Sequence, residues 1–319
     1  KVLKAVFGKF KAETTGIPEN YKTYDVTDKI KKLVNSGTND ILVSNRLINN
    51  VIPEGNKPGL KITYKTDGEE RTLFIPKGQL LKLSKDRPQP TLEFEDGTIN
   101  WTTPYAGKVN YTIASGEKKV VEVKSVPKPI DLSKDWQVSF PLTSEVSKNE
   151  SFSNLISWTA AKDEAIQHFS GTASYKKDFF LSDENLQPNT SLTLDLGSVS
   201  VIAEIIINGK NDGVLWKAPF RIPIDEFVTK GKNTLEIKVT NLWSNRLIGD
   251  EKLKLDYPRK GKRAKPLPEW LENKTERQSK RTTFVSWNHY TKNDELSISG
   301  LFGPVKIISS VTKNLYTLQ

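Results

Sequence analysis

Short stretches in which apolar and polar residues alternate occur along most of the chain. They are rich in β-branched residues and bounded by turn residues, which is typical of half-buried β-strands. The clearest stretches are 120–123, 174–180, 191–196, 203–207 and 234–239. Because turn residues divide the chain into strands at a spacing of roughly 8 to 15 residues, the pattern predicts antiparallel sheets rather than β-α-β units. We therefore expect an all-β fold built from β-sandwiches.

Glycine-containing dipeptides predict the hairpin turns between these strands, because their residues accept positive φ. These are Asp67-Gly68, Asp96-Gly97, Asn208-Gly209 and Asp212-Gly213. One short helix is expected near the N-terminus, capped by Thr27 or Asp28 and ended by Gly37. Its apolar face consists of Ile30, Leu33 and Val34.

The length of 319 residues suggests about two domains. Prolines 127 and 129 interrupt the strand pattern and mark the better candidate linker, at residues 125–129. We predict an N-terminal β-sandwich-like domain over 1–126 that includes the helix, and a jelly-roll domain over 130–319. A Lys- and Pro-rich insertion at about 252–283 interrupts the second domain, and insertions of this size in sandwiches are typically functional or mobile.

The composition removes several classes of function. With no cysteine and only 2 histidines, the chain has no disulfide framework, thiolate zinc site or cysteine nucleophile. No apolar run is long enough to cross a bilayer, and the N-terminus has no signal-peptide pattern, so we expect no membrane partner. Because the sequence starts at Lys1, we expect it to be a fragment or a processed form.

Positive charge raises the question of a nucleic-acid partner, since 48 Lys and Arg face 38 Asp and Glu, a net charge of +10. The dense basic run is Pro258–Pro266, bounded by prolines. Elsewhere basic residues alternate with acidic ones. We interpret the run as a solvated loop and expect no nucleic-acid partner.

Familiar catalytic signatures are missing from the sequence. It contains no Gly-x-Ser-x-Gly elbow, phosphate-binding loop, dinucleotide fingerprint or His-Glu-x-x-His motif. Adjacent acids are common but are interpreted as solvated turn residues, and the acid pairs of glycosidases come from distant positions. The adjacent pairs are Asp183-Glu184, Asp225-Glu226, Asp250-Glu251 and Asp294-Glu295. We assign no catalytic residue.

Aromatic rings and hydrogen-bonding side chains occur together in the stretches 241–250 and 287–290. Sugars stack their C–H faces on such rings, while their hydroxyls bind amide, carboxylate, guanidinium or imidazole groups. The first stretch follows a predicted strand, where loops carry function. The residues expected to bind carbohydrate are Trp243, Asn245, Arg246, Asp250, Trp287, His289, Trp216 and His168.

A purely structural interpretation of these residues stays open. In that interpretation Trp243 and Trp287 are core residues, and Arg246 forms an ion pair with Asp250. His168 would be a polar residue satisfied by hydrogen bonds. Phe220, near Trp216, packs between the sheets or lines a concave face, and we favour interior packing.

Motifs in the C-terminal half resemble a known family. Leu194-Asp195-Leu196-Gly197, Asn208-Gly209, Trp216 and Pro219-Phe220 look like the galactose-binding-like jelly roll of many β-glycoside hydrolases. The stretches 240–251, 267–271, 287–290 and 299–305 resemble the C-terminal end of glycoside hydrolase family 106, the α-L-rhamnosidases. The resemblance covers residues 160 to 306 and is fainter over the first 130.

This resemblance implies an accessory role. In that family an α/β barrel with calcium carries the catalytic acids, and no such alternation of strands and helices occurs here. We therefore expect a secreted or periplasmic, noncatalytic region that binds rhamnose-containing plant-type polysaccharide and supports a catalytic barrel of the same parent protein. A structural calcium ion is left open. The alternatives are a purely structural β-sandwich module that contacts other protein domains and, less favoured, a chain that hydrolyses glycosides by itself.

Overall fold

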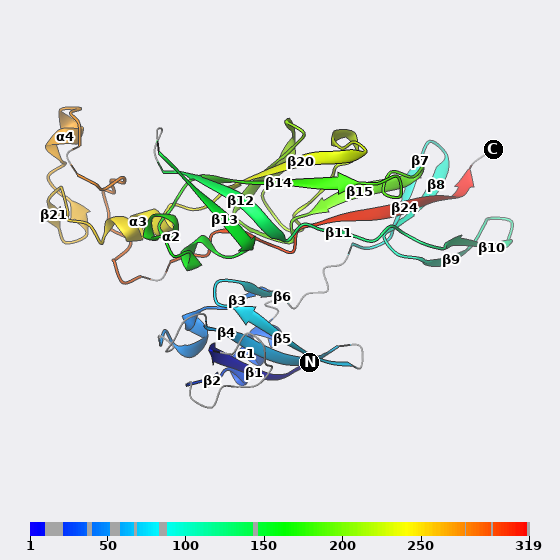
Figure 1. Ribbon diagram of the computed structural model, residues 1–319, viewed down its shortest axis with the longest axis horizontal. Coiled ribbons are helices and arrows are strands. Elements are labelled where there is room, and N and C mark those ends of the chain that lie inside the picture. The colour runs from blue at the N-terminus through cyan, green and yellow to red at the C-terminus, as the bar shows by residue number, and fades with distance from the viewer. Residues whose placement is uncertain are drawn as a thin grey trace. The chain divides into compact units, whose positions relative to one another are not determined.

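The structure is a computed structural model that describes residues 1–9, 22–36, 40–51, 58–66, 69–82, 88–142, 146–277, 279–294 and 296–317 (Figure 1). It contains two compact units. The first unit comprises Lys1–Lys85, Ile156–Ser170 and Leu242–Ser299. The second unit comprises Asp86–Leu155, Gly171–Asn241 and Gly300–Gln319.

Antiparallel sheets make up the second unit. One sheet has the order β13-β12-β14-β20-β17-β18, and the other has the order β19-β15-β24-β8-β7 with β11 also paired to β24 (Figure 1). Two small ladders, β10-β9 and β16-β23, complete the unit as described. The strands are β7 (Thr91–Glu95), β8 (Thr98–Thr103), β9 (Gly107–Thr112), β10 (Lys118–Val123), β11 (Ile130–Asp131), β12 (Lys134–Pro141), β13 (Ser147–Asn154), β14 (Thr172–Leu181), β15 (Thr190–Asp195), β16 (Ser198–Ser200), β17 (Ile202–Ile207), β18 (Lys210–Leu215), β19 (Arg221–Pro223), β20 (Gly231–Thr240), β23 (Gly300–Gly303) and β24 (Lys306–Thr317), with a 3-10 turn η3 (Asp225–Phe227).

Alternation of side chains along the strands builds the core of the second unit. On β20, Leu235, Ile237 and Val239 are fully buried while their neighbours face outward. The rings of Trp136 on β12 and Tyr175 on β14 meet edge to face, with centroids 6.1 Å apart. These sheets with one buried face confirm the predicted all-β sandwich class.

The first unit has sheets and a hydrophobic core of its own. Its larger sheet has the order β2-β1-β4-β5, and α1 packs against β1 (Figure 1). Phe7, Ile30, Leu60 and Ile62 are fully buried in its core. The elements are β1 (Val2–Lys9), β2 (Tyr24–Asp25), α1 (Thr27–Asn35), β3 (Asp40–Leu42), η1 (Asn45–Ile48), β4 (Pro58–Thr66), β5 (Glu69–Pro76), β6 (Leu80–Lys82), η2 (Trp158–Ala160), α2 (Glu164–Gln167), α3 (Ser244–Asp250), β21 (Arg259–Lys260), β22 (Arg263–Ala264) and α4 (Glu269–Glu272).

The predicted strands are confirmed, with β10, β14, β15, β17 and β20 covering the five stretches. Asp96-Gly97 and Asn208-Gly209 turn the hairpins β7–β8 and β17–β18 with positive φ at all four residues. Asp212-Gly213 was expected to be a third turn, which is wrong. The register of β17 and β18 shifts between the partners Gly213 and Asn211, so this dipeptide forms an irregularity within β18. The Asp67-Gly68 pair lies outside the described residues.

The predicted helix is present as α1, and Ile30 is its buried residue, as expected. Its predicted cap is wrong, because the residue before the helix is Val26 and no side chain caps it. The hydroxyl of Thr27 instead accepts a hydrogen bond from Ala5 N–H at 2.9 Å, so it ties the helix to β1. Gly37 lies outside the described residues.

The predicted domain boundary at 126–130 stays a prediction. Residues 124–129 have no regular secondary structure, as a linker would require. However, β8 pairs with β24 from Val311↔Thr103 to Thr317↔Thr98, so residues on both sides of the predicted linker share one sheet. Phe220 is buried, as predicted.

Candidate functional site

Helix α3 carries three of the residues predicted to bind sugar, Asn245, Arg246 and Asp250, and Trp243 directly precedes it. Its inner face buries Asn245, Ile248, Gly249 and Asp250, whereas Trp243, at the N-terminal end, is 65% exposed. An exposed indole next to a buried polar cluster is compatible with a stacking platform.

Asn245 is fully buried and holds α3 against the segment before β23. Its amide nitrogen donates to Ser297 O at 2.7 Å and to the hydroxyl of Ser299 at 3.1 Å. Its Oδ1 accepts from Ser297 N–H at 2.7 Å. The amide is fully used by these bonds, so Asn245 is placed to support the site rather than to touch a ligand.

Asp250 is also fully buried and anchors the segment that closes the insertion. Its Oδ2 accepts the backbone N–H of Thr282 at 2.9 Å, the N–H of Thr283 at 2.7 Å and the Thr283 hydroxyl at 2.7 Å. Its Oδ1 lies 2.9 Å from an Arg246 guanidinium nitrogen. This is the ion pair that the structural interpretation expected. Such a carboxylate is kept inside by charged and backbone donors together.

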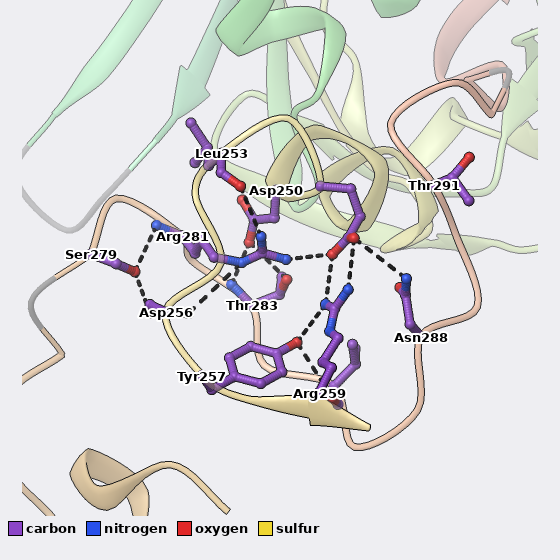
Figure 2. A network of polar contacts seen from close by, with 12 residues as sticks. Asp250, Leu253, Asp256, Tyr257, Arg259, Ser279, Arg281, Thr283, Asn288 and Thr291 are labelled. Atoms are coloured by element: carbon purple, nitrogen blue, oxygen red, sulfur yellow. Dashed lines mark hydrogen bonds and ion pairs between the residues drawn. The ribbon is translucent and has the colours of Figure 1, made fainter. Parts of the chain in front are cut away.

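Glu251, the next residue, is the centre of a second network (Figure 2). Arg259 reaches it with two nitrogens, at 2.8 and 2.7 Å, and Arg281 donates to it as well. The amide of Asn288 lies 3.4 Å from the same carboxylate. Hydrogen bonding from Arg259 lowers the pKa of Glu251, so the charged form is the stable one. The adjacent acids Asp250 and Glu251 are therefore not solvated turn residues, because buried donors surround them.

Asp256 accepts hydrogen bonds from residues near the C-terminal end of the insertion (Figure 2). The guanidinium of Arg277 forms two hydrogen bonds to it, and Ser279 donates a third. Hydrogen bonding by Arg277 lowers the pKa of Asp256 from 3.8 to about 2. Arg277 also lies over the ring of Trp270, 4.7 Å from its centroid. The insertion that was expected to be functional or mobile is thus held by three carboxylates, those of Asp250, Glu251 and Asp256.

The exposed part of the site lies beside the β21–β22 hairpin. Trp287 is 43% exposed, and the guanidinium of Arg263 lies 5.6 Å from the centroid of its ring. His289 is exposed. Since Trp243 and Trp287 are both largely accessible, the interpretation of these two rings as core residues is wrong.

His168 is buried instead of facing solvent. Its Nδ1 lies 2.8 Å from Glu164 O, and its ring packs against Gly249, where a Cβ would approach the imidazole Cδ2 to 2.8 Å. Burial lowers its pKa, which favours the neutral imidazole. His168 therefore occupies a packing position next to α3.

Trp216 belongs to the second unit, whereas the other seven candidate residues belong to the first. It is 66% exposed, and the Lys217 ammonium lies 5.3 Å from its ring centroid. The eight candidates therefore do not gather in one unit. Sugar binding by any of them stays a prediction.

An open groove of about 690 Å³ adjoins the network. It is lined by the stretch 253–258 together with Ser279 and Lys280. Leu253 and Leu255 give it exposed apolar surface, while Asp256 and Lys254 give it charge. Grooves with apolar walls and a few polar groups are common ligand sites.

The sequence interpretation missed Glu251, Arg259, Arg281 and Thr283. The presence of both acids and arginines in and next to the insertion was a signal of ion pairing. The basic run at 258–266 was instead interpreted as a solvated loop. That interpretation is wrong for Arg259, whose side chain is only 12% exposed and paired with Glu251. Pairing over 8 to 33 positions cannot be found from local patterns.

The described residues contain neither a cluster of metal-binding side chains nor a helix that could span a membrane. Within the described ranges there is no group of three or more His, Cys, Asp or Glu side chains that could hold a metal ion. No helix in the same ranges has the length and apolar character to span a bilayer.

Comparison with known proteins gives one strong similarity. No family model matches the chain. It is 54% identical over 314 residues to a Formosa agariphila protein described as "Putative beta-glucuronidase", an alignment that covers 98% of this chain and 27% of that protein. The chain thus spans about a quarter of the length of this curated relative, and the similarity extends over nearly all of the chain's own length.

Solved structures give weaker likenesses. A rhamnosidase from Novosphingobium sp. PP1Y has a TM-score of 0.45 and 21% identity, with 89% of this chain and 26% of that chain covered. A β-D-glucuronidase from Dictyoglomus thermophilum has a TM-score of 0.36 and 19% identity, with 58% of this chain and 28% of that chain covered.

Proposed function

We propose that this chain is the accessory carbohydrate-binding region of a larger secreted or periplasmic glycoside hydrolase. The alignment carries the proposal, because 98% of the chain matches only 27% of a relative named as a glycosidase. A catalytic domain in the remaining length of the parent protein, expected to be a barrel, would be the partner of this region. The chain alone would bind polysaccharide and not cleave it.

The sugar surface that we propose consists of Trp243 and Trp287, with His289 and Arg246 beside α3. Both indoles expose ring surface on which the C–H face of a sugar can stack. Asn245, Asp250 and His168 would support this surface from beneath, since their polar groups already bind protein atoms.

Two ligand classes follow from the two lines of resemblance. The motifs resemble α-L-rhamnosidases, which favours rhamnose-containing polysaccharide. The name of the relative points to β-linked glucuronic acid. Both sugars can belong to one polysaccharide, so the two ligands should be tested side by side.

Isothermal titration of the 319-residue chain tests the proposal, with rhamnogalacturonan oligosaccharides in one arm and oligoglucuronate in the other. We expect binding in at least one arm, and a loss of about tenfold or more in the double variant Trp243→Ala, Trp287→Ala. The control is Phe180→Ala, which removes an aromatic side chain that is 67% exposed on β14 of the second unit. Equal affinity of the double variant and the control would contradict the proposed surface.

A purely structural module is the second candidate. It is favoured by the number of buried ion pairs in the first unit, which serve packing alone if no sugar binds. Absence of binding in both arms would leave this role. Turnover of an aryl rhamnoside or aryl glucuronide by the chain would contradict both candidates, and we expect none.

A further inference from the structure

Positive charge is concentrated in the insertion. Residues 252–283 contain 11 Lys and Arg against 4 Asp and Glu, a surplus of 7 within a chain whose net charge is +10. One tenth of the sequence therefore carries most of the excess charge. Such a field attracts anions to one place on the surface.

Two carboxylates in or next to the insertion are paired with arginines, whereas the hairpin cations have no ion pair with a described residue. Glu251, just before the insertion, and Asp256 bind the arginines at 259, 277 and 281. In contrast, Lys260, Lys262, Arg263 and Lys265 are exposed and form no ion pair with any residue that the structure describes. Their positive charge is therefore available to bind an anionic ligand.

The hairpin places one of these cations, Arg263, beside an indole. The N–H of Asn288 donates to Lys262 O at 2.8 Å, and the N–H of Ala264 donates to Ser286 O at 3.0 Å. Arg263 and Trp287 form an isolated antiparallel bridge, with the guanidinium over the ring. Backbone hydrogen bonds therefore hold the hairpin against the segment that carries the ring.

A neutral sugar needs only the ring and hydroxyl partners. Cations at a fixed place beside the ring add a partner for a carboxylate or a sulfate ester, and guanidinium binds such groups with two parallel hydrogen bonds. Single-stranded nucleic acid would require several stacking rings along a basic groove. Around this hairpin Trp287 is the exposed ring in the described residues, which favours a saccharide.

We propose that the β21–β22 hairpin and Trp287 form a binding site for an anionic saccharide, whose carboxylate or sulfate ester is held by Arg263 and the hairpin lysines while its ring stacks on the indole. This rests on the proposed carbohydrate-binding function and narrows it to acidic sugars. Glu251 acts as a positioning residue, because it fixes Arg259 at the base of the hairpin and contacts Asn288.

The test is calorimetric titration of the full chain with four probes. They are a β-glucuronan hexasaccharide, the same hexasaccharide after reduction of its carboxyl groups, a sulfated dextran oligosaccharide of similar length, and oligothymidylate. We expect the reduced ligand to bind at least about tenfold more weakly than the uronate, and the uronate to weaken as NaCl rises from about 50 to about 500 mM. The relative affinities for uronate and sulfated dextran identify which anionic group is preferred.

Variants locate the site. We expect the triple change Lys260→Gln, Lys262→Gln, Lys265→Gln, and separately Arg263→Gln, to weaken uronate binding by about tenfold each. The matched control removes three exposed lysines of the second unit, by Lys118→Gln, Lys124→Gln and Lys128→Gln, and should change the affinity less than about twofold. Equal losses in the hairpin triple and its control would overturn the assignment to this hairpin.

The remaining outcomes separate the two proposals. Equal affinity for the uronate and its reduced form would overturn the anionic site and leave the carbohydrate-binding function standing. Tighter binding of oligothymidylate than of every saccharide would overturn the anionic-saccharide site in favour of nucleic acid. If no saccharide binds, both proposals fall.

Discussion

The sandwich of the second unit and the 242–299 segment of the first unit are held together by different forces. The sandwich buries large apolar side chains on alternating strand positions, among them Trp136 and Tyr175. The 242–299 segment contains little regular structure, and the carboxylates of residues 250, 251 and 256 hold its loops through arginines and backbone N–H groups.

This difference shows how a chain can fix a loop without a large core. Apolar burial is non-directional and tolerates small shifts, whereas a carboxylate with several donors accepts only one arrangement of them. The 242–299 segment therefore holds its exposed rings in defined positions and needs less buried apolar volume than the sandwich does. It should also respond to charge and pH in ways that the sandwich does not.

The largest effect should come from the sandwich core. We expect Trp136→Ala to lower the free energy of unfolding by about 3 to 5 kcal/mol, because it leaves a large cavity and loses the ring contact with Tyr175. Urea unfolding followed by circular dichroism measures this. Phe180→Ala, at a residue that is 67% exposed, should change stability by less than about 0.5 kcal/mol. Similar losses in both variants would show that the sandwich core is not where we place it.

Asp250→Ala tests the polar core of the 242–299 segment. It leaves the N–H and hydroxyl of Thr283 without their acceptor and Arg246 without its partner, so we expect a loss of about 2 to 3 kcal/mol. Asp250→Asn keeps an acceptor and should lose less. The control Asp183→Ala breaks an exposed pair with Lys230 and should cost less than about 1 kcal/mol in the same urea experiment. If Asp183→Ala lowered the free energy of unfolding as much as Asp250→Ala, the proposed role of Asp250 in the polar core would be contradicted.

Close packing at α3 gives a third comparison. In a helix, alanine is favoured over glycine by about 1 kcal/mol, which alone would make Gly249→Ala stabilising. A Cβ at this position, however, would lie 2.7 Å from the Cβ of His168, which cannot move easily. We therefore expect a net loss of about 1 to 2 kcal/mol in thermal or urea unfolding. Gly107→Ala, with open space around its Cβ, should be nearly neutral, and a stabilised Gly249→Ala would contradict the packing of His168 on α3.

Acid should loosen the 242–299 segment before the sandwich, and this is the smallest expected effect. The folded-state pKa of Asp256 is about 2, below its ordinary 3.8, so its pairing stabilises the fold above pH 4 and is lost as pH falls from about 4 to about 2. Glu251, whose pKa is also lowered, contributes in the same direction. The protection of amides in residues 253–283 against hydrogen exchange, corrected for the intrinsic exchange rate at each pH, should fall over this range, and much less so in Asp256→Asn, which is already loosened at neutral pH. Equal protection at pH 5 and pH 2.5 would contradict the role of these ion pairs.

Local patterns were sufficient for the strands. Alternation at positions such as 235, 237 and 239 predicts a half-buried strand without any knowledge of its partner, and β20 follows it. They were insufficient at Asp212-Gly213, because a dipeptide that suits a turn also suits an irregularity inside a strand. The choice depends on where the neighbouring strand ends.

The candidate site could be predicted only in part. Trp243 and Trp287 were singled out because rings and polar groups occur together, but the same pattern allowed a core position for both. Asn245, Asp250 and His168 were singled out as well, and they became buried supports. Side-chain chemistry indicates what a residue can bind, while its partners depend on which segments fold against it.

The amino-acid sequence determined the strand class, two of the hairpin turns and the excess charge of the insertion, since these depend on neighbours within a few positions. The tertiary structure alone decided that the carboxylates at 250, 251 and 256 are enclosed by arginines and threonines up to 33 positions away, while the hairpin lysines stay in water. The physical reason is that an ionised side chain can leave water only where several donors converge on it, and that convergence exists only once the chain has folded.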